Sequence, residues 1–310
     1  MSVTATVSPA INNSIGLAAE YLPLLDEIYK AESKTAILDT AQDRVRWSND
    51  THSFYLFETG MVGLGNYYRN GGFVRGDVTA SWRQYTPQYD RGRQFLVDRL
   101  DNAESMGMAF GTLASEFMRT KVIPEVDAIR FRDYSKNASN SMKTAENIST
   151  GSGAVAAIDL GVEKLDDAEV PYEGRILFVS PTMYKYLKSG ITRYTMNGEN
   201  GIDYNVEMYN DMRVITVPSG RFNTAITLAQ PSAHDGAGGY STTGSTINFM
   251  IIHPSAVMQV MKLANPRIFS PEVVQEADAW QYDFRQYHGA WVKHQKANGI
   301  YVNAPTVVSA

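Results

Sequence analysis

The chain has no cysteine among its 310 residues. Disulfides, zinc sites with thiolate ligands and cysteine nucleophiles are therefore excluded. No stretch approaches the ~20 apolar residues that a transmembrane helix needs. The opening residues, MSVTATVSPA, lack the basic and apolar regions of a secretion signal. We therefore expect a soluble protein that is not exported and has no membrane partner.

Motifs for catalysis and cofactor binding are also missing. Walker, HExxH, GxSxG, GxGxxG and EF-hand spacings do not occur. The glycine-rich stretches at Thr150 and Asp235 lack the lysine and the strand-to-helix context of a phosphate-binding loop. His288 and His294 lie near Asp283, which leaves a metal-dependent hydrolase formally open, but no ligand spacing supports a metal site. We predict no catalytic residue, no metal and no cofactor.

The chain also lacks the positive charge of a dedicated nucleic-acid binder. Its formal net charge is -5 at pH 7, whereas tight binding to nucleic acid needs a concentrated basic surface. A protein that encloses nucleic acid without binding it tightly is compatible with this negative net charge. With 44% hydrophobic residues, the chain can bury a sizeable core in one large or two modest domains.

Lysine is absent between Thr35 and Thr120, yet nine arginines lie there. Arginine differs from lysine in making planar, bidentate or stacked contacts with carboxylates and aromatic rings, which favours interface contacts. We predict that some of these arginines pair with carboxylates of neighbouring subunits. Replacing Arg91 or Arg93 with alanine should then impair assembly and leave the monomer folded. The candidate contact residues between subunits are Arg69, Arg75, Trp82, Arg83, Arg91 and Arg93.

Local patterns predict an arm, a hairpin and a long helix in the first half of the chain. An amphipathic helix interrupted by Pro23 is expected over 15–38, and its apolar stripe packs either on a partner or on its own domain. Alternating residues predict strands over 54–57, 77–85 and 88–97, and polar, aromatic composition is typical of an exposed hairpin.

A capping box at Asp101 and Glu104 opens a helix that apolar spacing extends from Ala103 to Tyr134, about 48 Å in length. Pro124 should kink this helix or split it in two, because proline removes a hydrogen bond and clashes one turn back.

The second half alternates between helices and strands. After a polar connection at 137–153, we expect a helix capped by Ser152, a strand at 175–179 and a helix opened by Ser180 and Pro181. Further strands are expected at 212–217, 225–229 and 247–252, which indicates an α+β or α/β domain. A last strand pattern starts at Trp280 and is broken by Gly289. Strands at 290–293 and 300–303 then complete a sheet beside the long helix.

Four stretches carry a resemblance to a known family. They are GLGNYYRNGGFVRGDVTASWRQYTPQYDRGRQFLVDRLDNAES, EFMRTKVIPEVDAIRFRDYS, ILFVSPTMYKYL and HPSAVMQVMKLANPRIFSPEVVQEADAWQYDFRQYHGAWVKHQKANGIYVN. On these stretches the chain resembles the major capsid proteins of tailed bacteriophages over most of residues 45–303. The resemblance implies an α+β fold of the Hong Kong 97-type phage capsid class, which encapsulin shells share.

The resemblance also implies five segments. They are an N-terminal arm at 1–50, an extended β-hairpin loop at 51–100, a peripheral domain with the spine helix at 101–149, an axial domain at 150–262, and peripheral-domain return strands with the C-terminus at 263–310. Some relatives carry a large scaffolding region before the arm, whereas here about fifty residues precede the loop. Scaffolding is therefore expected either from a separate protein or not at all.

The implied function is structural and not enzymatic. Copies of the chain would assemble as hexamers and pentamers into the icosahedral shell of a virion, in the cytoplasm of a bacterial host. The implied partners are the packaged double-stranded DNA, a portal protein, and optional scaffolding or decoration proteins. An encapsulin-like compartment that encloses a cargo protein is the alternative.

Some shells of this fold are cross-linked by an isopeptide bond between a loop lysine and an asparagine of a neighbour. Because the loop here has only arginines, which stay protonated, we expect a shell held by non-covalent contacts.

Overall fold

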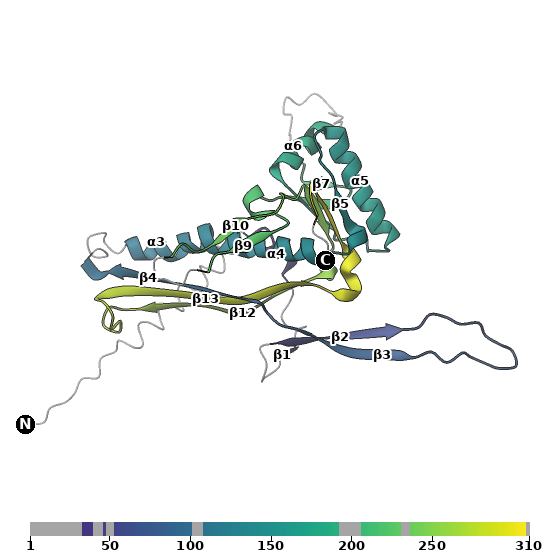
Figure 1. Ribbon diagram of the computed structural model, residues 1–310, viewed down its shortest axis with the longest axis horizontal. Helices are drawn as coiled ribbons and strands as arrows, with labels where there is room; N and C mark the ends of the chain where they lie inside the picture. The colour runs from purple at the N-terminus through teal and green to yellow at the C-terminus, as the bar shows by residue number, and fades with distance from the viewer. Residues whose placement is uncertain are drawn as a thin grey trace, which may run out of the picture.

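The computed structural model describes residues 33–39, 46–47, 53–100, 108–191, 206–230 and 236–307. A body of helices and sheets carries a long hairpin that projects from one end (Figure 1). Most of the predicted N-terminal amphipathic segment lies outside the described residues. Its last residues form a short 3-10 helix, η1 (Ala36–Leu38). Among the described residues no helix is both long and apolar enough to cross a membrane.

The projecting hairpin consists of β2 (Phe54–Met61) and β3 (Val78–Tyr85), which pair antiparallel from Phe54 opposite Tyr85 to Met61 opposite Val78. A two-residue strand, β1 (Arg46–Trp47), pairs with the start of β2. Both strands predicted here are confirmed, and β2 is longer than expected. Phe54 and Tyr85 are buried against Met258 and Val260 of the body, and Gln295 Nε2 donates to the Thr59 carbonyl at 3.0 Å. The paired strands are therefore held to the body at these points.

The predicted long helix is present over its described part. It comprises α3 (Met108–Phe117), a π-helical turn η3 (Met118–Val122) and α4 (Ile123–Asn137). The π turn ends just before Pro124. A π turn inserts one extra residue, and this accommodates a proline that cannot donate a hydrogen bond and crowds the preceding turn.

A three-stranded antiparallel sheet lies beside this helix, in the order β12-β13-β4 (Figure 1). Ile123 and Val126 pack with Ile268, Tyr282 and Phe284 of the sheet. The strands are β4 (Tyr89–Asp98), β12 (Val257–Phe269) and β13 (Ala279–Val292).

The structure of this sheet differs from the sequence predictions at three points. Gly289 does not break the last strand, because β13 runs continuously from Ala279 to Val292. β12 was not predicted. It contains Pro266, which is tolerated because β12 is an edge strand, where a missing backbone donor is acceptable. β4 was predicted with the hairpin, yet it pairs with β13.

A six-stranded mixed sheet forms the second part of the body, in the order β5-β14-β11-β6-β8-β7. Its central strands read ILFV and FMII and are fully buried, as expected of a sheet covered on both faces. α5 (Gly151–Asp167) and α6 (Pro181–Gly190) cover one face. The strands are β5 (Lys143–Ala145), β6 (Ile176–Val179), β7 (Met208–Tyr209), β8 (Met212–Thr216), β11 (Phe249–Ile252) and β14 (Ile300–Ala304).

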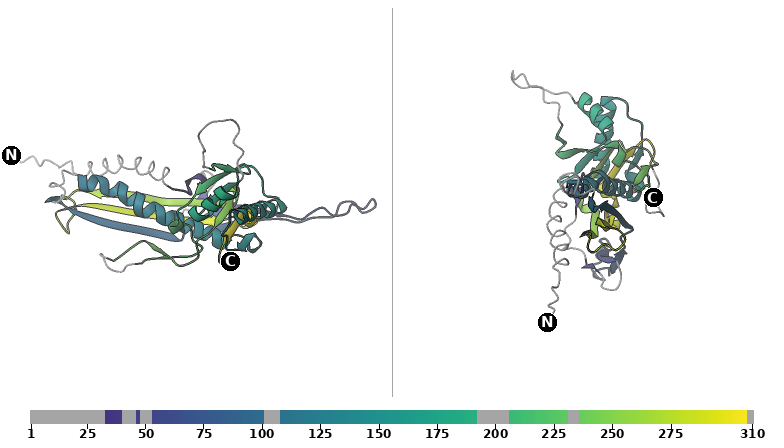
Figure 2. Two further views of the ribbon diagram at one scale, coloured as in Figure 1. Left: turned by 90° about the horizontal axis from the view of Figure 1, so that it is seen from above. Right: turned by 90° about the vertical axis from the view of Figure 1, so that its left-hand side faces the viewer.

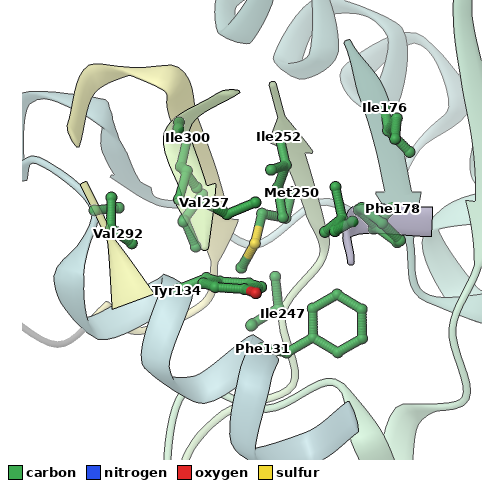
Figure 3. Close-up of a cluster of buried hydrophobic side chains, with 14 of the residues drawn as sticks. Phe131, Tyr134, Ile176, Phe178, Ile247, Met250, Ile252, Val257, Val292 and Ile300 are labelled. Carbon is green, nitrogen blue, oxygen red and sulfur yellow. The ribbon is translucent and has the colours of Figure 1, made fainter. Parts of the chain in front are cut away.

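The other face of this sheet packs on α4 and joins the two parts of the body. Phe131 and Tyr134 of α4 lie against Phe178, Met250 and their neighbours (Figure 3). Two predictions need correction here. β14 belongs to this sheet and not to the sheet beside the long helix, and Thr150, not Ser152, caps α5 by accepting a hydrogen bond from the Gly153 backbone N–H.

A small hairpin of β9 (Ile226–Leu228) and β10 (Tyr240–Thr242) reaches over α4, where Ile226 and Leu228 pack with Ala128 and Ile129. Short 3-10 helices complete the described chain, namely η4 (Asn140–Met142), η5 (Ser219–Arg221), η6 (Pro254–Ala256) and η7 (His294–Gly299).

The buried Asp127 of α4 holds the segment before η1. Its carboxylate accepts hydrogen bonds from the hydroxyls of Ser33 and Thr35, both at 2.7 Å. It also forms an ion pair with Arg221 at 3.4 Å. The chain is therefore fastened to α4 at residues 33–35.

Candidate functional site

The projecting hairpin exposes large apolar side chains along its length. Leu64 is fully exposed and Phe73 is 88% exposed. So many exposed large apolar side chains in one segment are unusual on a monomer and indicate an interaction site. The exposed large apolar residues of the hairpin are Phe57, Met61, Val62, Leu64, Tyr67, Tyr68, Phe73, Val74, Val78 and Trp82.

Four of the predicted contact residues lie on this hairpin. Trp82 is half exposed, and its ring lies 5.1 Å from that of Phe57. Arg83 pairs with Glu58 across the two strands at 3.6 Å. Within the described part of the chain, no carboxylate pairs with Arg69 or Arg75. These two arginines stay candidates for contacts between subunits.

The other two predicted contact residues, Arg91 and Arg93, have partners in their own chain. Arg91 Nε donates to Glu125 Oε1 at 2.7 Å, and Nη2 donates to Oε2 at 3.3 Å. Arg91 also donates to the carbonyls of Ala229 and Gly239 at 2.7 and 3.2 Å. Arg93 Nη1 donates to the carbonyl of Gly236 at 2.9 Å. Both residues therefore make contacts within their own subunit, and their part in contacts between subunits stays a prediction.

These bonds belong to a larger set at the start of β4, directly after the hairpin. The Tyr287 hydroxyl donates to the carbonyl of Pro87 at 2.8 Å, and Arg285 forms a bidentate pair with Asp90 at 2.9 and 2.5 Å. The hydrogen bonds from Arg285 lower the pKa of the Asp90 carboxyl. Residues 87–93 are thus fixed to the body at several points, which sets the direction in which the hairpin leaves it.

Tyr89 belongs to the same set and is partly buried. Its hydroxyl donates to Asp133 Oδ1 at 3.1 Å and accepts a hydrogen bond from Arg132. Burial, reinforced by the Asp133 carboxylate, raises the pKa of the Tyr89 hydroxyl to about 12. Burial also raises the pKa of the Asp133 carboxyl. Tyr89 therefore stays a neutral hydrogen-bond donor at physiological pH.

The residues that left a hydrolase open do not form a site. His288 is fully buried in β13, and burial, with Arg130 and Arg91 nearby, lowers its pKa to about 3. Asp283 lies five positions earlier, an odd separation that places it on the opposite face of the strand. His294 lies beyond the strand in η7. The described residues contain no group of three potential metal ligands.

Sequence reasoning missed Glu125 as the partner of Arg91. A signal was present, because Glu125 lies on the helix face marked by Val122, Val126 and Ile129. A carboxylate on a buried apolar face needs a cation beside it. The pattern could therefore have predicted an ion pair, although not which arginine supplies it.

No protein-family model matches the sequence, and no curated protein matches it either. The structure is similar to the capsid structure of the cyanophage P-SCSP1u, with a TM-score of 0.60 and 12% identity over 87% of each chain. The mature capsid of bacteriophage PhiM1 gives a TM-score of 0.54 and 14% identity over 83% of this chain and 82% of the other. The chain has the phage capsid fold.

The phage capsid fold extends to a structure that is not named as a phage. A virus-like particle from Pyrococcus furiosus gives a TM-score of 0.52 and 12% identity over 93% of this chain and 99% of the other. The predicted α+β, Hong Kong 97-type fold class is confirmed. The five segment boundaries given above stay predictions.

Proposed function

We propose that the chain is the major capsid protein of a tailed bacteriophage, and that copies of it assemble as hexamers and pentamers into an icosahedral shell. One observation carries the proposal. A chain with the phage capsid fold bears a long hairpin whose apolar side chains are exposed and whose root is fixed to the body. A subunit that must cover its neighbours needs such an arm.

The proposed role of the shell is to enclose double-stranded DNA without sequence-specific binding. A net charge of -5 supports enclosure over tight binding, because a strongly basic wall would hold the DNA against packing and release. The proposed location is the virion, after assembly in the cytoplasm of the host. A portal protein is the expected partner at one vertex, and scaffolding or decoration proteins are further candidates.

The proposed shell is held together without covalent links between subunits through the hairpin. The chain has no cysteine, and no lysine lies between Thr35 and Thr120. Arginine cannot supply the deprotonated amine that an isopeptide bond requires.

An encapsulin-like compartment is the second candidate, and the similarity to the virus-like particle supports it because that match covers 93% of this chain. The two candidates differ in the contents of the particle. Particles isolated from the natural source that contain nuclease-protected double-stranded DNA support the capsid proposal. Particles that contain a protein cargo and no DNA support the compartment.

Electron microscopy of the purified chain tests the shell itself. The chain should be examined alone and after co-expression with proteins encoded beside it. Uniform closed particles are the expected result. A chain that stays a dispersed monomer under all these conditions would contradict the proposal.

A further inference from the structure

A cavity of about 570 Å³ lies between the long helix and the paired strands β4 and β13. Figure 1 and Figure 2 show the helix lying along the sheet that holds these strands. Three parts of the chain line the cavity, namely the two strands, the helical stretch from Leu113 to Glu125, and residues 237–239 just before β10. A cavity of this size with walls on several sides is typical of a binding site for a small molecule.

The apolar wall of the cavity consists largely of phenylalanine rings. Phe95 of β4, Phe117 of α3 and Phe284 of β13 line it, together with Leu113 and Val122. The rings of Phe95 and Phe117 meet edge to face with their centroids 4.8 Å apart, and Phe117 meets Phe284 in the same way at 5.9 Å. Because aromatic rings attract one another in this geometry, the wall favours a ligand with a flat aromatic body.

One polar side chain of the cavity has no partner in the described part of the chain. Gln286 of β13 lines the cavity and is only 3% exposed. Its side-chain amide makes no hydrogen bond with any described residue. A buried amide without a partner costs stability, and a molecule bound in the cavity would remove this cost by forming the hydrogen bond. Gln286 is therefore available to a ligand.

The two carboxylates that line the cavity are both paired with arginines. Glu125 lies 2.7 Å from the Nε atom of Arg91, and Glu116 lies 2.9 Å from the Nη2 atom of Arg119. The described walls of the cavity therefore present no unpaired negative charge.

Two cations that line the cavity have no such partner. Arg93 of β4 uses Nη1 to bond the carbonyl of Gly236, and Lys121 is exposed at the π-helical turn η3. Among the residues that the structure describes, no carboxylate pairs with either cation. Turns of the π type occur frequently at functional sites. The cavity therefore combines an aromatic wall with two cations that are free to attract an anion.

We propose that this cavity binds a small aromatic anion, with the rings of the ligand against the phenylalanine wall and its negative charge beside Arg93 and Lys121. Gln286 forms a hydrogen bond with a polar atom of the ligand. The inference goes beyond the proposed shell function and does not depend on it, because every residue of the site belongs to a single subunit.

Two dyes test the site in dissociated subunits of the full chain. Anilinonaphthalene sulfonate carries the expected negative charge, phenylnaphthylamine has the same rings without the charge, and both fluoresce in apolar surroundings. Arg93→Gln should weaken binding of the sulfonate by about tenfold or more, because a hydrogen bond to a charged group is lost. Lys121→Gln, at an exposed position, should weaken it about two- to fivefold. Affinity for the uncharged dye should stay within about twofold in both variants.

Matched variants separate the cavity from other apolar surfaces of the subunit. Arg75→Gln removes a positive charge from the exposed hairpin and should change the affinity for the sulfonate less than about twofold. Gly238 lines the cavity, and a Cβ there would lie 3.8 Å from Arg93 Nη1, an ordinary contact. Gly238→Trp should therefore obstruct the cavity and weaken binding of both dyes by about tenfold or more. Gly220→Trp, at a position with open space outside the cavity, should not.

The outcomes either support the site or overturn it. Weaker binding of the sulfonate alone in Arg93→Gln supports it. Equal losses of both dyes in that variant overturn the assignment of the negative charge to Arg93, and unchanged binding in Gly238→Trp overturns the cavity as the site. Gln286→Leu should be at least as stable as the wild type without ligand, and a lower urea midpoint would show that the amide serves the fold instead.

Assembled particles give the last test of the occupant. Binding of the sulfonate to particles with the affinity seen in dissociated subunits supports a small molecule as the ligand. Loss of binding on assembly would show that another protein chain covers or fills the cavity, and would overturn the small molecule as its occupant.

Discussion

Replacing Arg91 with alanine should destabilise the folded subunit itself. The Arg91 side chain is 21% exposed and its partner Glu125 is 10% exposed, so both charges lie largely out of water. The substitution removes the bidentate bonds to Glu125 and leaves the carbonyls of Ala229 and Gly239 without this donor. The sequence predicts that Arg91→Ala leaves the monomer folded, and these contacts add that the folded monomer should be less stable.

The size of the effect follows from the buried carboxylate that remains. Removing one partner of a buried ion pair costs about 3–5 kcal/mol, mainly because the other charge is left uncompensated. Since Arg91 keeps some exposure, we expect a loss near the lower end, about 3 kcal/mol. A double variant, Arg91→Ala with Glu125→Gln, removes both charges together and should recover at least half of that loss.

Urea unfolding of dissociated subunits measures these free energies. The slope of the unfolding free energy against urea concentration should be the same for all variants, which shows that the same unfolding transition is compared. Arg285→Ala is the control, because the Arg285–Asp90 pair lies only a few residues away and is 63% and 45% exposed. We expect no measurable change for it, since exposed pairs contribute little. A wild-type urea midpoint for Arg91→Ala, or a double variant as unstable as the sum of the two single variants, would refute the reasoning.

Three further predictions concern packing, pH and covalent linkage. Gly161→Ala should destabilise the subunit by about 1–2 kcal/mol, because the new Cβ would lie 2.8 Å from the ring of Tyr301, whereas Gly220→Ala, with open space around it, should not. His288 has a folded pKa of about 3, below its unfolded value of 6.5, so it reduces stability as the pH falls from 6.5 towards 3. His288→Gln should therefore weaken the pH dependence of unfolding in that window, and an unchanged dependence would count against the buried neutral ring. Particles boiled in detergent should run as one band near 34.4 kDa, and a ladder of larger species would contradict non-covalent assembly.

The sequence predicted those elements whose local pattern agrees with their final environment. Alternation over 54–57 and 77–85 predicted the hairpin, and the spacing from Leu113 to Ile129 predicted the long helix. β12 was missed because Pro266 reads locally as a break, and only its place at a sheet edge makes proline acceptable there. The pairing of β4 with β13 joins residues nearly two hundred positions apart, and no local pattern specifies it.

The candidate site was predicted in part. The absence of lysine predicted that some of the arginines contact neighbouring subunits, and Arg69 and Arg75 stay candidates for such contacts. Composition could not separate these from Arg91 and Arg93, because an arginine with a partner in its own chain looks the same in sequence as one whose partner lies in another. The amphipathic character of the hairpin also depends on register. The alternation within β3 shows two faces, but only the pairing with β2 shows that Phe57 and Met61 share a face with Trp82 and Val78.

A reconstruction of assembled particles by electron cryomicroscopy tests the central claim most directly. The account predicts a closed icosahedral shell in which the exposed apolar side chains of each hairpin, among them Phe57, Met61, Val78 and Trp82, are buried against a neighbouring copy of the chain. A closed shell with these side chains open to solvent, or particles in which the hairpin touches no neighbour, would contradict it.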